Sequence, residues 1–143
     1  MRRLYRSIDT VHRQTSLKLE TASPIPIYLQ IMEQIRQRIA AGTLPAECEL
    51  PSVRALASEH LINPNTVARA YLELEREGLL SKRRGAGTYV SSSAARLGAE
   101  YARRTVRDLL DKALDAGAEF GFTPEQICEL VDERLAARME IGV

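Results

Sequence analysis

Two groups of side chains in this sequence are of the types that recognise a nucleic acid. Asn65, Thr66 and Arg69 fall outside the apolar positions at the start of a predicted helix. Asn and Arg can each make two hydrogen bonds to the edge of one base, and Thr can contact a phosphate or a thymine methyl group. The second group is the run Lys82-Arg83-Arg84, beside the glycines of a predicted turn. Lys and Arg side chains neutralise backbone phosphates, so this run is a candidate DNA contact.

These residues also have ordinary structural interpretations. Helix capping fully explains Asn63, so we assign it no DNA contact. Thr66 and Arg69 could be a turn residue and a solvated charge, and Arg54 could be an ordinary surface arginine. We favour DNA contact for these three residues because each lies near the start of one of two neighbouring helices. A run of cations usually covers a solvated face, but Lys82-Arg83-Arg84 coincides with the tip of an independently predicted hairpin.

The first elements that must position these residues lie near the beginning of the chain. Residues 1–15 show no clear period, and we interpret them as a flexible basic tail. Residues 17–20 alternate apolar and polar side chains, which predicts one short strand. From Ile27 onward, apolar residues recur at three- and four-residue intervals and predict a helix that Gly42 ends.

Two further helices and a hairpin follow. Ser52 can cap a short second helix, and Asn63-Pro64 provides an N-cap and a proline at the first position of a third. Gly78 ends that helix. Residues 79–83 and 87–90 then predict two strands around a glycine-containing turn. Three helices and a hairpin with a basic tip are typical of a winged helix-turn-helix, in which the third helix enters the major groove and the hairpin is the wing.

Residues 94–143 predict two amphipathic helices. Gly117 to Gly121 interrupts the pattern, and Thr123-Pro124-Glu125-Gln126 has the arrangement of a capping box before the last helix. Two helices enclose too little volume to bury both apolar stripes, so we expect a second copy of the chain to cover them. The predicted dimerisation residues are Leu97, Tyr101, Val106, Leu109, Leu110, Leu114, Ile127, Leu130, Val131 and Leu135.

Composition limits the classes of protein that fit. The chain has 143 residues, 45% of them hydrophobic, and a net charge of +1 that runs from a basic start to an acidic end. Two separated cysteines and two scattered histidines make no zinc site, and no apolar run is long enough for a membrane span. No clustered catalytic set is present. We therefore expect a cytoplasmic, mainly α protein without cofactor, metal or enzymatic activity.

In these motifs the sequence resembles the GntR family of bacterial repressors. The motifs lie in the family's order and spacing over about half the chain, and the two-helix tail resembles that of the YtrA-like subfamily, which is associated with dimerisation. The stretches that carry the resemblance are Pro26-Ile27-Tyr28-Leu29-Gln30-Ile31, Gly42-Thr43-Leu44-Pro45, Leu50-Pro51-Ser52-Val53-Arg54-Ala55-Leu56-Ala57, Asn63-Pro64-Asn65-Thr66-Val67-Ala68-Arg69-Ala70-Tyr71, Leu74-Glu75-Arg76-Glu77-Gly78-Leu79 and Arg84-Gly85-Ala86-Gly87-Thr88-Tyr89-Val90.

The resemblance implies a homodimeric repressor that binds a near-palindromic operator in double-stranded DNA. The implied and predicted DNA-binding residues together are Arg54, Asn65, Thr66, Arg69, Lys82, Arg83, Arg84, Gly85, Gly87 and Thr88. Pro64 and Ala68 stand where much of the family has Arg, so those base contacts do not carry over, and Arg69 is the substitute. Glu47 replaces a usual Gly, and Glu49 replaces a frequent basic residue, which weakens any phosphate contact from that loop.

The expected organisation is a tail (1–15), a winged helix-turn-helix (16–93) and a two-helix dimerisation domain (94–143). Two alternatives stay open. One is a metabolite-sensing regulator with an effector site in the dimer interface of the last domain, although two helices without a clustered polar set make a poor pocket. The other is a winged-helix protein-interaction module without DNA affinity, which the run Lys82-Arg83-Arg84 disfavours.

Overall fold

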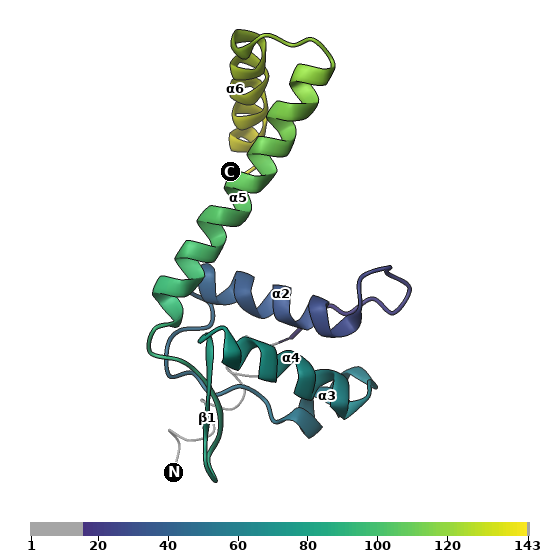
Figure 1. Cartoon of the computed structure of the whole chain (residues 1–143), viewed down its shortest axis with the longest axis vertical. Coiled ribbons are helices and arrows are strands. Elements are labelled where there is room, and N and C mark those ends of the chain that lie inside the picture. Colours follow the sequence, from purple (N-terminus) through teal and green to yellow (C-terminus); the bar gives the residue numbers. More distant parts are fainter. Residues whose placement is uncertain (1–15, 143) are drawn as a thin grey trace. The chain divides into compact units, whose positions relative to one another are not determined.

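The computed structural model describes residues 16–142, and this part of the chain contains five helices and one two-stranded antiparallel sheet (Figure 1). The chain divides into two compact units between Ala102 and Arg103, within one helix. The elements are α2 (Ile27–Ala40), α3 (Val53–His60), α4 (Pro64–Arg76), β1 (Leu80–Arg83), β2 (Gly87–Val90), α5 (Ala94–Glu119) and α6 (Pro124–Ile141). The predicted winged helix-turn-helix and the two helices after it are confirmed. The tail prediction for residues 1–15 lies outside the described residues.

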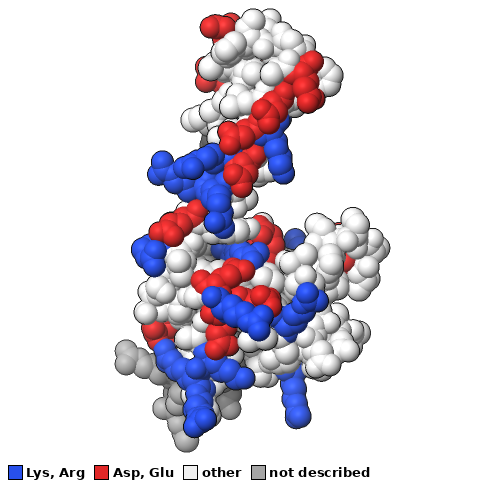
Figure 2. Space-filling model, viewed as in Figure 1, with Lys and Arg blue, Asp and Glu red and all other residues white. Residues whose placement is uncertain are grey.

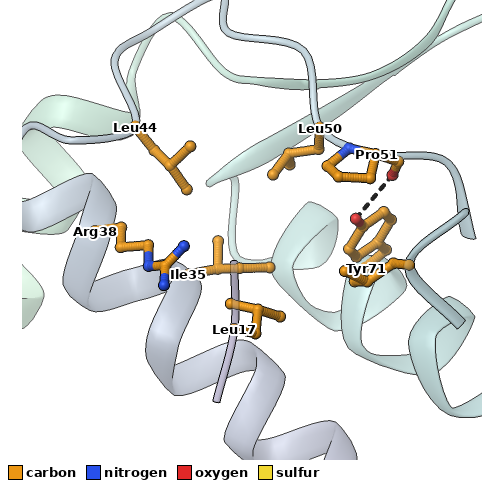
Figure 3. A pocket seen from close by; sticks show the side chains of 8 residues that line it. Leu17, Ile35, Arg38, Leu44, Leu50, Pro51 and Tyr71 are labelled. Carbon is orange, nitrogen blue, oxygen red and sulfur yellow. Dashed lines mark hydrogen bonds between the residues drawn. The ribbon is translucent and has the colours of Figure 1, made fainter. Parts of the chain in front are cut away.

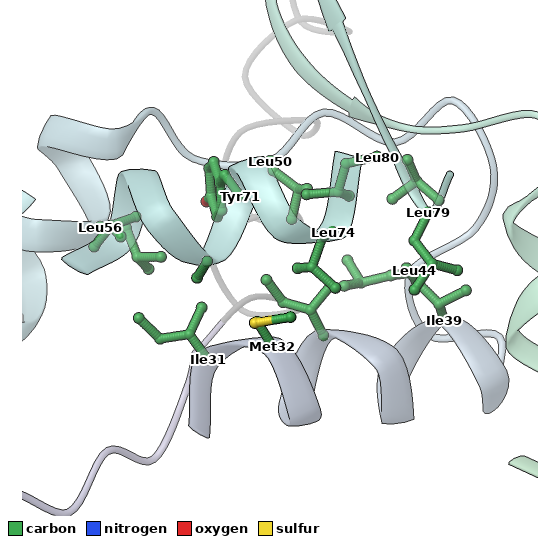
Figure 4. Close-up of a cluster of buried hydrophobic side chains, with 14 of the residues drawn as sticks. Ile31, Met32, Ile39, Leu44, Leu50, Leu56, Tyr71, Leu74, Leu79 and Leu80 are labelled. Carbon is green, nitrogen blue, oxygen red and sulfur yellow. The ribbon is translucent and has the colours of Figure 1, made fainter. Parts of the chain in front are cut away.

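The first unit is built around one aliphatic core, shown in Figure 4. Helix α2 buries four residues at helical spacing, and α4 packs across it with four more. Leu74 of α4 and Ile31 of α2 are fully buried, and Leu80 of β1 joins them from the hairpin. Each such leucine or isoleucine contributes roughly 1.5–3 kcal/mol of transfer free energy when it leaves water. The shared core therefore fixes the third helix and the wing against the same support.

The helix starts are set locally, as the sequence predicts. The Ser52 side chain accepts a hydrogen bond from the Ala55 amide at 3.1 Å, and the Asn63 side chain accepts one from the Asn65 amide at 2.9 Å. Pro64 occupies the first turn of α4, where its missing N–H would have had no helical partner. Both predicted N-caps are confirmed.

The hairpin has a partner that the sequence pattern did not indicate. Strands β1 and β2 pair from Leu80 opposite Val90 to Arg83 opposite Gly87. Residues 47–50 run along the other edge of β2, where the Val90 amide donates to the Cys48 carbonyl at 2.8 Å and the Leu50 amide donates to the Thr88 carbonyl at 2.9 Å. The wing is thus anchored on the loop that precedes α3.

The predicted strand at residues 17–20 is wrong. The backbone there is held by two glutamine side chains of α2 instead of by another strand. Gln34 accepts from the Lys18 amide at 2.8 Å and donates to the Lys18 carbonyl at 2.7 Å, and Gln30 makes the same pair of bonds with Glu20, both at 2.9 Å. The side-chain amides of Gln34 and Gln30 thus take the backbone hydrogen bonds of Lys18 and Glu20 that a neighbouring strand would take, and no sheet forms. Leu17 is buried in the core.

The first two turns of α5 belong to the first unit. Ala94 is fully buried and Leu97 packs against the core. Gly98 approaches α2 so closely that a Cβ there would lie 2.9 Å from Ile39 Cγ2 and 3.2 Å from the Ala40 nitrogen. One turn later, the Tyr101 hydroxyl donates to the Glu33 carboxylate. The compact division therefore falls later than residue 93, where the predicted winged helix-turn-helix ends.

The second unit is a pair of helices, the rest of α5 and α6. The interruption predicted from Gly117 to Gly121 is shorter than expected, because α5 continues through Gly117 to Glu119. Gly117 serves close packing, since a Cβ there would lie 2.7 Å from Ile127 Cδ1 of α6. The predicted capping box at the start of α6 is confirmed, with reciprocal bonds between Thr123 and Gln126 at 2.9 and 3.2 Å.

Candidate nucleic-acid interface

The start of α4 presents polar side chains to solvent while its opposite face is buried. Asn65 is exposed and Thr66 is half-buried, whereas Val67 and Ala70 are fully buried. The Asn65 backbone N–H is occupied by the cap, which leaves its side-chain amide available for an external partner. This geometry is the one that base-edge contacts in a major groove require, with a rigid helix that offers donors and acceptors from its first turn.

Arg69 is held in place by a contact between helices. Its guanidinium carbon lies 3.8 Å from the centroid of the Tyr28 ring on α2, a cation–π contact. Stacking of this kind uses the face of the guanidinium and leaves the N–H groups at its edge able to donate. Arg69 therefore lies on the exposed side of α4 with a restricted orientation, which fits its predicted role in reading a base.

Arg54 is the second residue of α3 and is exposed. It follows the Ser52 cap, so it lies at the N-terminal end of the bracing helix, where backbone N–H groups and the helix dipole favour an anion. Helix α3 reaches α4 through the Tyr71 hydroxyl, which donates to the Pro51 carbonyl at 2.8 Å. This bond ties the segment just before α3 to the middle of α4 and so fixes the two helices against each other.

The wing carries the cations that the sequence predicted. Lys82, Arg83 and Arg84 are all exposed, and Figure 2 shows blue side chains gathered at the hairpin end of the first unit. A hydrogen bond from the Ala86 amide to the Arg83 carbonyl at 3.0 Å closes the turn. Gly85 has a φ of +74°, a conformation that favours glycine. Thr88 is half-buried in β2 and Gly87 is exposed beside the turn.

The structure separates the three wing cations. Successive side chains of a strand point to opposite faces, so Lys82 and Arg83 face opposite ways. Arg83 forms an ion pair with Glu47, and its guanidinium carbon lies 4.1 Å from the centroid of the Tyr89 ring. Among the described residues, Lys82 and Arg84 have no such ion pair. Lys82 and Arg84 are therefore the cations most available to phosphates.

A small gap lies inside the first unit beneath the Tyr71–Pro51 hydrogen bond, as Figure 3 shows. Its volume is about 10 Å³, which is at the lower limit for one water molecule and far too small for a metabolite. Its lining is mostly apolar and consists of Leu17, Ile35, Arg38, Leu44, Leu50, Pro51, Leu56 and Tyr71. Within residues 16–142, no group of His, Cys, Asp and Glu side chains is placed to hold a metal ion.

The second unit has no buried residue among those described. Its large apolar side chains stay about half-exposed, for example Val106 at 57%, Leu110 at 53% and Leu135 at 55%. The same holds for Leu109, Leu114, Leu130 and Val131, while Ile127 is covered in part beside Gly117. A helical hairpin without an interior of its own needs a further surface to cover these residues.

Two of the predicted dimerisation residues are engaged within the first unit. Leu97 packs on the core beside Gly78, and Tyr101 contacts α2 through the Glu33 carboxylate. Arg36 lies 5.2 Å from the Tyr101 ring centroid and pairs with Glu77 at the end of α4. The hydrogen bond to Glu77 raises the pKa of Arg36 and outweighs the opposite effect of its partial burial.

Two partners of the predicted residues were not identified from the sequence. Tyr28 was assigned only an apolar position of α2, and Glu47 only the role of a replacement that weakens phosphate contact. Each contacts its arginine across at least 36 residues of sequence. Glu47 stands where the related family pattern has glycine, which is the signal in the sequence that its position is unusual. In the structure its φ is +66°, a left-handed conformation that favours glycine.

Comparison with known proteins agrees with this geometry. Residues 27–90 match the profile of bacterial regulatory proteins of the gntR family. The chain is 35% identical over 117 residues to the HTH-type transcriptional repressor YtrA of Bacillus subtilis, which covers 82% of this chain and 90% of that relative. The chain belongs to the GntR family. The YtrA-like resemblance of the sequence is confirmed, and the GntR profile ends at the last residue of the wing.

Solved structures match more of the chain than the family profile does. A transcriptional regulator from Oenococcus oeni superposes with a TM-score of 0.71 at 32% identity, over 82% of this chain and 97% of that one. YtrA from Sulfolobus acidocaldarius, a GntR-family transcription factor, matches with a TM-score of 0.54 at 34% identity, over 69% and 97% of the two chains. The chain is therefore a DNA-binding regulator by family and not an enzyme. Within its described part, no helix is long and apolar enough to cross a membrane.

Proposed function

We propose that this GntR-family chain is a homodimeric transcriptional repressor that binds a near-palindromic operator. The first two turns of α4, with Asn65, Thr66 and Arg69, read base edges in the major groove. The wing and Arg54 contact the backbone. The observation that carries the proposal is the two-sided character of α4, whose apolar face is buried while Asn65 and Arg69 are exposed and Thr66 is half-buried.

The wing supports the proposal through its charge. Lys82 of β1 and Arg84 of the turn are both exposed, and Gly85 and Gly87 beside them both have positive φ. Each phosphate that a cation neutralises releases counterions and steepens the log–log salt dependence of binding by about 0.9. The related YtrA from Bacillus subtilis is named a transcriptional repressor, which favours repression over activation for this chain.

Dimerisation is supported by the second unit. Its apolar residues cannot be covered by the two helices that carry them, and a twofold pairing of identical hairpins covers both copies at once. Leu109, Leu110, Leu114, Leu130 and Leu135 are central to this surface. Two copies of the recognition helix would then meet half-sites centred about one helical turn, or a small multiple of it, apart.

The DNA part of the proposal is tested by footprinting on the region upstream of the chain's own gene, followed by fluorescence anisotropy on the protected sequence. Arg69→Ala is expected to lower affinity for the operator more than for a random duplex. Lys82→Ala is expected to weaken both equally and to reduce the salt slope by about 0.9. Unchanged slopes and unchanged discrimination would contradict the proposal.

The dimer is tested by light scattering coupled to size-exclusion chromatography. Leu114→Lys is expected to shift the measured mass from two copies to one. The matched control is Leu72→Lys, because Leu72 of α4 is exposed to a similar degree, 45% against 48% for Leu114. A wild-type protein that elutes as a monomer at micromolar concentration would refute the dimer.

The metabolite-sensing alternative has no comparable support. A depression on α6, lined by Leu130, Val131, Arg134, Leu135 and Arg138, is open to solvent and lies on the same apolar surface as the proposed dimer contact. We propose no effector. Thermal-shift screening of the dimer against metabolites would reveal one as a rise in unfolding temperature at saturating ligand.

A further inference from the structure

A carboxylate in the loop beside the wing competes for one of the cations of the wing. Arg83 is one of three adjacent positive residues, yet it is paired with the Glu47 carboxylate and stacked on the Tyr89 ring. The side chains of Arg83 and Glu47 are 46% and 55% exposed, so both stay within reach of an external ligand. A carboxylate and a phosphate accept from a guanidinium in the same two-oxygen geometry.

The backbone places Glu47 for this contact. Its amide donates to the Val90 carbonyl at 2.9 Å, which fixes it beside β2, and its φ of +66° turns the chain at that point. Non-glycine residues adopt this conformation at a cost in free energy. Glu47 therefore occupies a position where a glycine would be less strained, and its side chain contacts the wing arginine.

We propose that Glu47 lowers the affinity of the wing for the DNA backbone by occupying Arg83, and so limits binding that does not depend on sequence. The inference rests on the proposed function, in which the wing contacts phosphates. Glu47 is a positioning residue in this scheme and touches no DNA itself. To engage a phosphate fully, the Arg83 guanidinium must release the carboxylate, and the Tyr89 ring keeps it in place during the exchange.

The size of the effect follows from exposure. An exposed ion pair contributes a factor of about 1.5 to 5 to an equilibrium constant, because water screens it. Glu47→Gln keeps the length of the side chain and removes its charge. We therefore expect a gain of about 1.5- to 5-fold in affinity for a duplex of random sequence and a salt slope steeper by up to about 0.9.

Removing any carboxylate near DNA raises affinity through long-range electrostatics, so the test is a double-mutant cycle. The probe is a fluorescein-labelled duplex of about 30 base pairs with random sequence, and anisotropy is measured at several salt concentrations for wild type, Glu47→Gln, Arg83→Ala and the double variant. The gain from Glu47→Gln is expected to disappear in the Arg83→Ala background. A gain that persists there would show a general charge effect and would overturn the proposal.

Two control variants complete the design. Glu49→Gln removes a neighbouring carboxylate that lies beside Gly87, with Oε1 3.2 Å from where a Cβ on that glycine would be, and that has no ion pair in the described chain. Its effect is expected to be the same with and without Arg83. Lys82→Ala, on the opposite face of β1, distinguishes failure of the proposed DNA contact by the wing from failure of the proposed competition by Glu47. If Lys82→Ala leaves the affinity for DNA unchanged, the proposed function fails. If it lowers that affinity but Glu47 and Arg83 show no coupling, only the competition by Glu47 is refuted.

Discussion

Replacing Tyr71 with phenylalanine tests whether one buried hydroxyl holds the recognition helix to the bracing helix. Tyr71 of α4 is 5% exposed, and its hydroxyl donates to the carbonyl of Pro51, which is itself buried, at 2.8 Å. Pro51 immediately precedes the Ser52 cap of α3. Tyr71→Phe keeps the ring in the core and removes only this hydrogen bond.

The cost follows from the burial of both partners. A buried carbonyl that loses its donor retains the desolvation penalty of an unpaired polar group, about 1–3 kcal/mol. We expect the free energy of unfolding, measured by urea denaturation and circular dichroism at pH 7, to fall by about 1–2 kcal/mol with an unchanged m-value. Tyr89→Phe is the control, because its hydroxyl donates to the Ala86 carbonyl at 3.0 Å in an exposed position and should cost less than about 0.5 kcal/mol.

The same substitution changes the response to high pH. Burial, more than the nearby Glu59 carboxylate, raises the pKa of Tyr71 above its usual value. Above pH about 10 the unfolded tyrosine ionises while the folded one stays protonated, so stability falls by up to about 1.4 kcal/mol per pH unit. Tyr71→Phe should flatten this fall. Equal stability of the two Phe variants at pH 7, together with an unchanged alkaline profile, would refute the assigned role of the hydroxyl.

Three further substitutions test the framework around the site. Gly98→Ala should destabilise the first unit by about 1–3 kcal/mol in urea denaturation, because the new Cβ would lie 2.9 Å from Ile39 Cγ2 and 3.2 Å from backbone; a neutral result would show that α5 can move away freely. Thr123→Ala removes the α6 cap and should lower the stability of the second unit by about 1 kcal/mol, which amide hydrogen exchange on α6 would report as faster exchange; unchanged exchange would show that the cap contributes nothing there. Leu74→Ala, at a fully buried position, should cost about 2–5 kcal/mol, whereas Leu72→Ala on the exposed side of α4 should cost far less, and similar losses would contradict the assigned orientation of the helix.

Contacts between residues close in the sequence can be predicted from it, whereas contacts between distant segments cannot. Ser52, Asn63 and Thr123 announce helix starts because a cap is made between residues two or three positions apart. The apolar spacing of α2 and α4 likewise fixes which face each helix buries. These features predict the winged helix-turn-helix and its exposed polar residues without any knowledge of the tertiary structure.

Pairing with distant side chains lay beyond such reasoning. The alternation in residues 17–20 indicates an extended backbone correctly, but it cannot show that Gln30 and Gln34 supply the hydrogen bonds in place of a strand. The stripe on α5 is equally ambiguous, since Leu97 continues the same pattern as Leu109 although only Leu97 packs within the first unit. Periodicity identifies an apolar face but not the surface that covers it.

The order of residues along the chain was thus enough to place the capped helix starts and the hairpin, to show which faces are apolar, and to indicate the family of DNA-binding regulators to which the chain belongs. The distribution of the cations, with Arg69 stacked on Tyr28 and Arg83 paired with Glu47, emerged only once the chain was folded. The difference is one of range. Caps and periodicity act over one or two helical turns, whereas an ion pair or a ring contact depends on which distant segments the shared core brings together.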